Sequence, residues 1–168
     1  MKHIIIKGIG PDRPGIVSSI SGFVTSIGGN IEESRMIRLG SEFSIIMMVA
    51  IQEDMLGTLK DSLDGIDGIK FYITETKKIH TLASPTHILN LTGGDTEGIV
   101  HKMTDVLMSM GVNIIEVNTD TENAPVTGTI VFKMAVRLDI GSCDENKLSI
   151  ELARLESKLG LSIALDRI

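Results

Sequence analysis

The chain has 168 residues, a formal net charge of −6 and a single cysteine, Cys143. Its 42% of apolar and 23% of charged residues are typical of a globular protein and exclude a disordered chain. The 16 lysines and arginines form no run that would neutralise phosphates, so we expect no direct nucleic-acid binding, and the lone cysteine excludes an intramolecular disulfide and favours a reducing, cytoplasmic location.

The first elements can be predicted in chain order. The segment "MKHIIIKGIG" predicts a strand, because it lacks the long apolar region and cleavage site of a signal peptide. A helical apolar pattern over 16–27, which includes Val17, is expected to end at Gly28, and its counterpart in the second half at Gly111. Two strands over 30–39 and 42–51 predict a hairpin, and the second has Phe43, Ile45, Met47, Val49 and Ile51 on one face. A second helix over 55–66 and an alternating strand over 69–76 follow. No apolar run approaches the roughly 20 residues that span a bilayer, so we expect no membrane segment.

The second half of the chain repeats the first at a constant shift, which pairs Gly10 with Gly93 and Asp12 with Asp95. The element order is therefore β-α-β-β-α-β, twice, with a longer hairpin tip over 120–128 in the second copy. In the strand after this tip, the alternation predicts that Ile130, Phe132, Met134, Val136 and Leu138 point inward. This order predicts an α+β chain of two ferredoxin-like modules, 1–80 and 86–168, joined by a linker at 79–85. Each module is expected to have an antiparallel sheet with both helices on one face, and side-by-side pairing of the two sheets would cover an edge strand of each.

The stretch "GIGPDRPG" between the first strand and the first helix has two interpretations. It lacks G-x-G-x-x-G and G-K-[ST], so it is no nucleotide-binding loop, but the free N–H groups of a helix N-terminus favour a carboxylate or phosphate. Asp12 is expected to cap the helix, and Pro14 to lie in its first turn. Arg13 is expected to be exposed in this loop and suits a contact to a carboxylate, although a solvated charge is the alternative. Asn30 and its counterpart in copy two are either turn residues or amide ligands.

Residues for catalysis or metal binding are few. The histidines His3, His80, His87 and His101 are scattered without metal-ligand spacing, and we expect them to be hydrogen-bonded or solvated. Serines occur without a G-x-S-x-G elbow, and Cys143 lies in an acidic loop. We therefore predict no catalytic residue, no metal site and no cofactor.

The motifs "GIGPDRPGIV" with "GGNI", and "LTGGDTEGIV" with "GVNI", resemble those of the ACT domain. Two such modules in one chain of this length resemble the glycine cleavage system transcriptional repressor group. The resemblance implies a non-enzymatic sensor that binds a small amino acid, glycine or serine, between paired domains whose sheets join. It also implies a protein partner, such as a DNA-binding activator of glycine cleavage genes, and leaves a homodimer open.

The resemblance also implies a set of ligand-binding residues. Copy two has lost the arginine and proline of the motif, so copy one is expected to bind better. The implied residues are Gly10, Pro11, Asp12, Arg13, Pro14, Gly15 and Asn30 in copy one, and Asp95, Gly98 and Asn113 in copy two.

Two other functions stay open at this point. An acylphosphatase-like hydrolase would use Arg13 and Asn30 to hold and attack an acyl phosphate, although its loop pattern is not matched here. An ACT interaction module without a ligand would use its sheet edges and methionine-rich surface for association.

Overall fold

The computed structural model describes residues 1–77, 84–124 and 128–168. The chain divides into two compact units, Met1–His80 and Thr81–Ile168, each with its own sheet and core. The linker expected at 79–85 falls largely on residues 78–83, which lie outside the described residues. The domain bounds 1–80 and 86–168 and the side-by-side pairing of the sheets therefore stay predictions.

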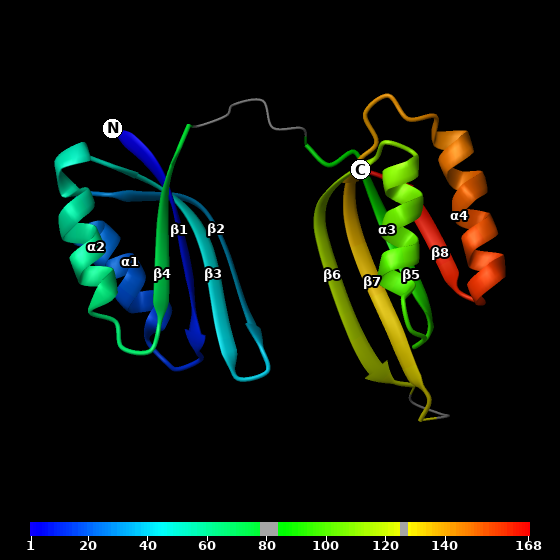
Figure 1. Ribbon diagram of the computed structural model, residues 1–168, viewed down its shortest axis with the longest axis horizontal. Helices are drawn as coiled ribbons and strands as arrows, with labels where there is room; N and C mark the ends of the chain where they lie inside the picture. Colours follow the sequence, from blue (N-terminus) through cyan, green and yellow to red (C-terminus); the bar gives the residue numbers. More distant parts are fainter. Residues whose placement is uncertain (78–83, 125–127) are drawn as a thin grey trace. The chain divides into compact units, whose positions relative to one another are not determined.

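The first unit has the predicted order of elements (Figure 1). Its strands form one antiparallel sheet in the order β2-β3-β1-β4, with both helices on one face. A short 3-10 turn, Glu53–Met55, leads into the second helix. The elements are β1 (Lys2–Pro11), α1 (Ile16–Ser26), β2 (Asn30–Leu39), β3 (Glu42–Ile51), α2 (Leu56–Asp64) and β4 (Lys70–Thr76).

The second unit repeats this arrangement, with the sheet order β6-β7-β5-β8. Strand β6 continues to Asn123, so the first part of the tip expected at 120–128 extends the strand, while residues 125–127 lie outside the described residues. Within the described ranges no helix is long and apolar enough to cross a membrane. The elements are β5 (His87–Gly94), α3 (Ile99–Ser109), β6 (Asn113–Asn123), β7 (Ile130–Asp139), α4 (Glu145–Leu159) and β8 (Ser162–Arg167).

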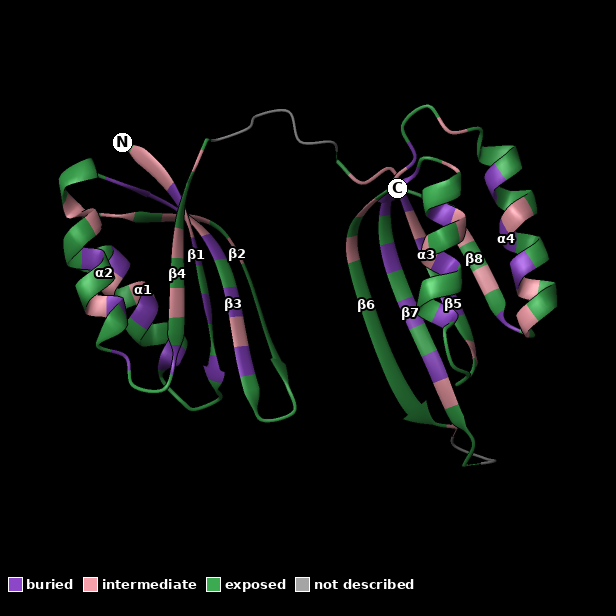
Figure 2. Cartoon of the chain, viewed as in Figure 1, coloured by how far each residue is buried: buried purple, intermediate pink, exposed green. Residues whose placement is uncertain are grey.

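The core of each unit lies between its sheet and its helices, because successive strand residues point to opposite faces (Figure 2). The predicted inward residues of β3, from Phe43 to Ile51, are buried. In β7 the prediction is wrong at Ile130, which is exposed because it pairs with Asn123 near the hairpin tip. Val17 also differs from its predicted place in the helical stripe. It is exposed because it is rotated about 100° from the buried Ile16.

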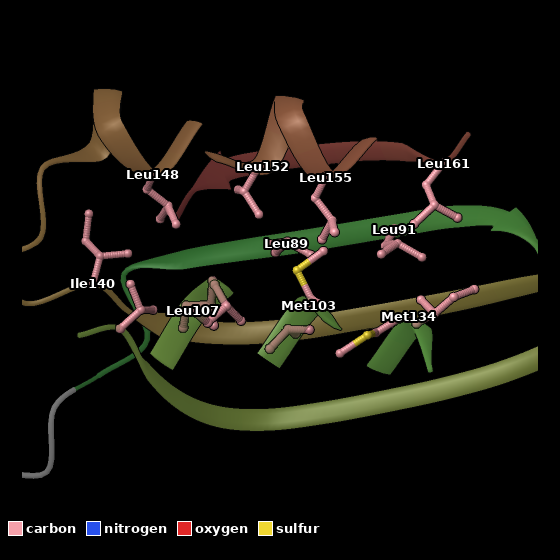
Figure 3. Close-up of a cluster of buried hydrophobic side chains, with 14 of the residues drawn as sticks. Leu89, Leu91, Met103, Leu107, Met134, Ile140, Leu148, Leu152, Leu155 and Leu161 are labelled. Carbon is pink, nitrogen blue, oxygen red and sulfur yellow. The ribbon is translucent and has the colours of Figure 1, made fainter. Parts of the chain in front are cut away.

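In the second core, helices α3 and α4 direct leucines and a methionine onto the sheet (Figure 3). Met103 and Leu107 of α3 and Leu148 of α4 belong to one buried cluster with Leu89 and Met134 of the strands. Burial of each such side chain stabilises the unit by about 1.5 to 3 kcal/mol. With aromatic residues making up only 3% of the chain, aliphatic and methionine side chains carry this packing.

Helices α1 and α3 end alike, at glycines in the left-handed conformation. The N–H of Gly28 donates to the carbonyl of Thr25, and that of Gly29 donates to the carbonyl of Val24. Gly111 and Val112 make the equivalent bonds to Met108 and Leu107. This is a Schellman motif, which favours glycine because φ is near +70° at Gly28 and Gly111. The two predicted helix ends are thereby confirmed.

Candidate functional site

The first-unit loop, residues 12–15, joins β1 to α1 at one end of the sheet. The strand reaches it through Gly10, which pairs with Phe43 and is buried. A Cβ on Gly10 would lie 2.2 Å from the carbonyl oxygen of Gly68, so glycine is required here by a close backbone approach. Gly10 and Pro11 therefore fix the course of the backbone into the loop. Gly10 is buried and has no exposed group that could contact a ligand.

Three contacts hold the loop against neighbouring segments. The backbone N–H of Asp12 donates to the carbonyl of Ser41 over 2.8 Å, in the β2–β3 turn. The Asp12 carboxylate lies 3.8 Å from the guanidinium of Arg38. Arg13 Nη2 donates to the carbonyl of Asp67 over 2.7 Å, between α2 and β4. Arg13 is exposed, as predicted, but it is a positioned side chain rather than a freely solvated one.

The expected capping role of Asp12 is wrong. The N-cap of α1 is Gly15, with φ of 92°, and no side chain caps the helix. Pro14 precedes the N-cap, so it lies just outside the first helical turn where it was expected. The first N–H groups of α1 therefore have no side-chain acceptor, and the first turn holds no acidic residue.

The second unit leaves the start of α3 uncapped in the same way. Gly98 is the N-cap with φ of 78°, and no side-chain acceptor reaches the helix from Asp95. By contrast, the Asp144 carboxylate caps α4 by accepting hydrogen bonds from the N–H groups of Asn146 (3.0 Å) and Lys147 (3.3 Å). The fold therefore accommodates a side-chain cap at one helix and leaves the two loop-facing helices open.

The second-unit loop, residues 95–98, differs in charge from the first. Thr96 and Glu97 stand where the first unit has Arg13 and Pro14. The N–H of Asp95 donates to the carbonyl of Ile130 over 3.4 Å, and Lys102 Nζ donates to the carbonyl of Glu97 over 3.4 Å. A carboxylate at Glu97 opposes an incoming anion, whereas the first unit has a guanidinium nearby.

Asn30 and Asn113 open β2 and β6, as predicted, but lie at the far end of their sheets from the loops. Asn30 pairs with Ala50, which also pairs with His3 at the start of β1. The loop instead follows Pro11, which pairs with Glu42 at the other end. The β-α-β connection explains this, because the helix runs back along the sheet before the second strand begins. Within one unit the asparagine and the loop are therefore not brought together.

Arg38 is a loop-facing residue that the sequence motifs did not indicate. It lies on β2 opposite Phe43, and the hairpin register carries it to the end of the sheet where Asp12 lies. The register of the predicted 30–51 hairpin would have placed Arg38 at this end of the sheet.

At the opposite end of the sheet, hydrogen bonding to Glu75 raises the pKa of Lys2, and a second hydrogen bond to Glu53 adds to the effect.

The described histidines do not form a catalytic or metal-binding group. No cluster of three or more potential metal ligands occurs among the described residues, and His80 lies outside them. His3 faces Glu32 at 3.4 Å and His101 faces Asp105 at 3.5 Å. His87 is buried and hydrogen-bonded, with Nδ1 2.9 Å from Thr86 Oγ1. Its Nε2 has no hydrogen bond and lies 3.5 Å from Glu145 Oε1.

Known proteins similar to this chain point to one family. The model of the ACT domain family matches residues 2–66. The glycine cleavage system transcriptional repressor of Escherichia coli K12 is 48% identical over 48 residues, which are 29% of this chain, and the Shigella flexneri repressor matches equally. The match spans a quarter, 25%, of the length of these curated relatives.

Two solved structures have the same fold over nearly the whole chain. An unknown protein from Galdieria sulphuraria superposes with a TM-score of 0.86 at 28% identity, covering 99% of this chain and 98% of that one. A candidate glycine cleavage system transcriptional repressor superposes with a TM-score of 0.69 at 21% identity, covering 99% and 97% of the two chains. The second of these shows similarity of fold alone.

Proposed function

Because the first unit of this chain is an ACT domain and the second unit has the same fold, we propose that the chain is a non-enzymatic sensor of a small amino acid. Glycine and serine are the first candidates. The two curated relatives are named as repressors of the glycine cleavage system, which supports glycine or a related amino acid as the ligand. The observation that carries the proposal is the open N-terminus of α1 beside the exposed loop of Arg13.

The open helix end suits the carboxylate of an amino acid. The first N–H groups of α1 have no side-chain cap, and the helix carries partial positive charge at this end. Arg13 donates one hydrogen bond to the Asp67 carbonyl, which leaves further guanidinium N–H groups for a ligand. A glycine or serine carboxylate would receive hydrogen bonds from the loop and attraction from both charges.

In this proposal, the loop of the first unit binds the amino acid more tightly than the loop of the second unit. Glu97 places an acidic residue where the first unit has Pro14, and Thr96 replaces Arg13. Asn30 and Asn113 contribute to such a ligand only from a module other than the one whose loop holds it, since each lies at the far end of its own sheet.

The output of the sensor is proposed to pass to a protein partner, a transcriptional regulator that the chain modulates in the cytoplasm. Ligand binding would act by favouring one of two arrangements of the chain, and a coupling of about 1 to 3 kcal/mol would suffice. The net charge of −6 supports a protein partner over DNA.

Thermal unfolding of the full chain against each of the twenty amino acids tests this function. A ligand that binds only the native state raises the midpoint, and a concentration of 100 times the dissociation constant adds about 2.7 kcal/mol. We expect a concentration-dependent rise with glycine or serine. No rise with any amino acid would favour an interaction module without a ligand.

A matched pair of variants tests the site. Arg13→Ala should weaken binding by about tenfold, because one charge-assisted contact is lost, whereas Thr96→Ala at the equivalent position of unit two should not. Calorimetric titration of both variants with the amino acid found in the screen measures this. Equal binding by Arg13→Ala and the unaltered chain would place the site elsewhere.

The acylphosphatase-like alternative has no geometric support within unit one. Its two proposed residues, Arg13 and Asn30, lie at opposite ends of the sheet and cannot hold one acyl phosphate together.

A further inference from the structure

The sheet of the first unit has one face that no helix of that unit covers (Figure 2). Its central row crosses all four strands: Arg35 on β2, Ile46 on β3, Lys7 on β1 and Tyr72 on β4. The row beside it holds Ile37, Ser44, Ile9 and Lys70 in the same strand order. We call this surface the open face of unit one.

Large apolar side chains project from the open face of unit one. Ile9 is 49% exposed, Ile46 45% and Tyr72 61%, and they lie on three adjacent strands. A shallow hollow of about 260 Å³ lies among these side chains, Lys7 and Ser44. Single exposed apolar residues are ordinary, but a contiguous group on one flat face is typical of an interaction surface.

The second unit provides an internal comparison, because it has the same fold. By strand register, Ile9 corresponds to Thr92, Ile46 to Ala135 and Tyr72 to Ala164. Ile37 likewise corresponds to Asp120. The fold is therefore built without large apolar residues at these positions, so in unit one they serve a purpose other than folding.

We propose that the open face of unit one packs face to face against the same face of a second copy of the chain. Two sheets pack in this way at about 10 Å, with their strands within about 30° of each other. A two-fold axis along the strands reverses the strand order of the partner, so that β2 lies over β4 and β3 over β1. Each row of one copy then meets the same row of the other in reverse.

This arrangement is complementary in size and keeps the like charges of the two copies apart. The small Ser44 meets the large Ile9 of the other copy, and the two sheets can interdigitate there. Arg35 meets Tyr72, which suits a contact between a guanidinium and an aromatic ring. Lys7 meets Ile46, so neither lysine of these rows faces itself. An axis across the strands would instead place Lys7 on Lys7 and Arg35 on Arg35, which like-charge repulsion disfavours.

The size of the face predicts a weak dimer. Four strands about 4.8 Å apart and about seven residues long cover about 20 by 24 Å, or about 500 Å² on each copy. The total of about 1,000 Å² is the lower limit for a specific interface. We therefore expect a dissociation constant in the micromolar range, and an equilibrium that shifts with concentration.

Sedimentation equilibrium of the full chain, with a reducing agent to protect Cys143, tests the proposal from about 1 to 500 µM. The mass should rise from 18.2 kDa toward twice that value. Ile46→Lys should raise the dissociation constant at least about 100-fold, because it places a second lysine opposite Lys7 of the other copy. Ala135→Lys, the equivalent change in unit two, should leave it within about twofold. Circular dichroism and thermal unfolding confirm that both variants fold.

A charge exchange tests the axis. Arg35→Glu and Tyr72→Arg should each weaken the dimer, the second by placing two arginines together. The double variant should recover most of the loss, because a glutamate then meets an arginine across the axis. A chain that remains at 18.2 kDa throughout, or a dimer that Ile46→Lys does not weaken, would overturn the proposal. A double variant no tighter than the single variants would overturn the axis.

Discussion

Gly10 and Gly93 occupy the same position in the two repeats, yet a side chain there would meet different atoms. At Gly10 an added Cβ would lie 2.2 Å from the backbone oxygen of Gly68, which belongs to the turn before β4. At Gly93 it would lie 2.4 Å from Leu161 Cδ2, the end of a flexible side chain. Backbone moves less readily than a leucine methyl group, so the two glycines differ in how strictly they are required.

Gly10→Ala should therefore destabilise the chain by about 3 kcal/mol, and Gly93→Ala by about 1 kcal/mol. Urea unfolding of the two variants, compared at equal m-values, measures the difference. The segment that packs against Gly10 also contains Asp67, whose carbonyl accepts the hydrogen bond of Arg13. Gly10→Ala would displace this segment and should therefore weaken amino-acid binding as well. Equal losses of stability in the two variants would contradict this explanation.

Residue-level prediction from sequence was limited by contacts between distant segments. The exposure of Arg13 was predicted correctly from its loop, but its bond to the Asp67 carbonyl joins residues far apart in the chain. Asp12 was expected to cap α1 because aspartate commonly precedes helices, whereas Gly15 takes the N-cap. The separation of Asn30 from the loop follows from the β-α-β connection and was available in principle from the predicted topology.

At the scale of elements, the helix starts differ in whether a side chain caps them. The Asp144 carboxylate satisfies two N–H groups of α4, while α1 and α3 begin at glycines without a side-chain acceptor. Element type and order were predictable, because helical and alternating apolar patterns recur in both copies at the same shift. Helix starts were not, because the choice between neighbouring cap residues depends on φ values that the pattern does not contain.

Asp144→Ala should lower the free energy of unfolding by about 1 kcal/mol, because two N–H groups of α4 lose their acceptor. Asp95→Ala is the matched control, since Asp95 precedes α3 without capping it, and it should change stability by less than about 0.5 kcal/mol. Urea unfolding measures both. A larger loss for Asp95→Ala than for Asp144→Ala would contradict the assignment of the caps.

At the scale of the whole molecule, two units of one fold have acquired different surfaces. Each has a separate core, and the described start of the second unit is tied into its own sheet. The N–H of Thr86 donates to the carbonyl of Leu138, its hydroxyl oxygen accepts from Ile140, and its carbonyl accepts from Ile168. Thr86 thus belongs to the second unit although it precedes the first strand of that unit.

A fragment of residues 84–168 should therefore fold alone and unfold in one cooperative transition in urea. A fragment of residues 87–168 keeps all of β5 but lacks Thr86 and the three bonds described above, and should be less stable by about 3 kcal/mol, at about 1 kcal/mol for each bond. Circular dichroism during urea titration compares the two. Absence of a cooperative transition in the longer fragment would show that the second core depends on the first unit.

The exposed ring of Tyr72 has an optical consequence. It is the only tyrosine of the chain, and the chain has no tryptophan. Ultraviolet emission excited near 280 nm therefore arises at one known point, on β4 at the edge of the first sheet. Quenching of this emission by acrylamide reports the solvent access of that point without any label or engineered probe.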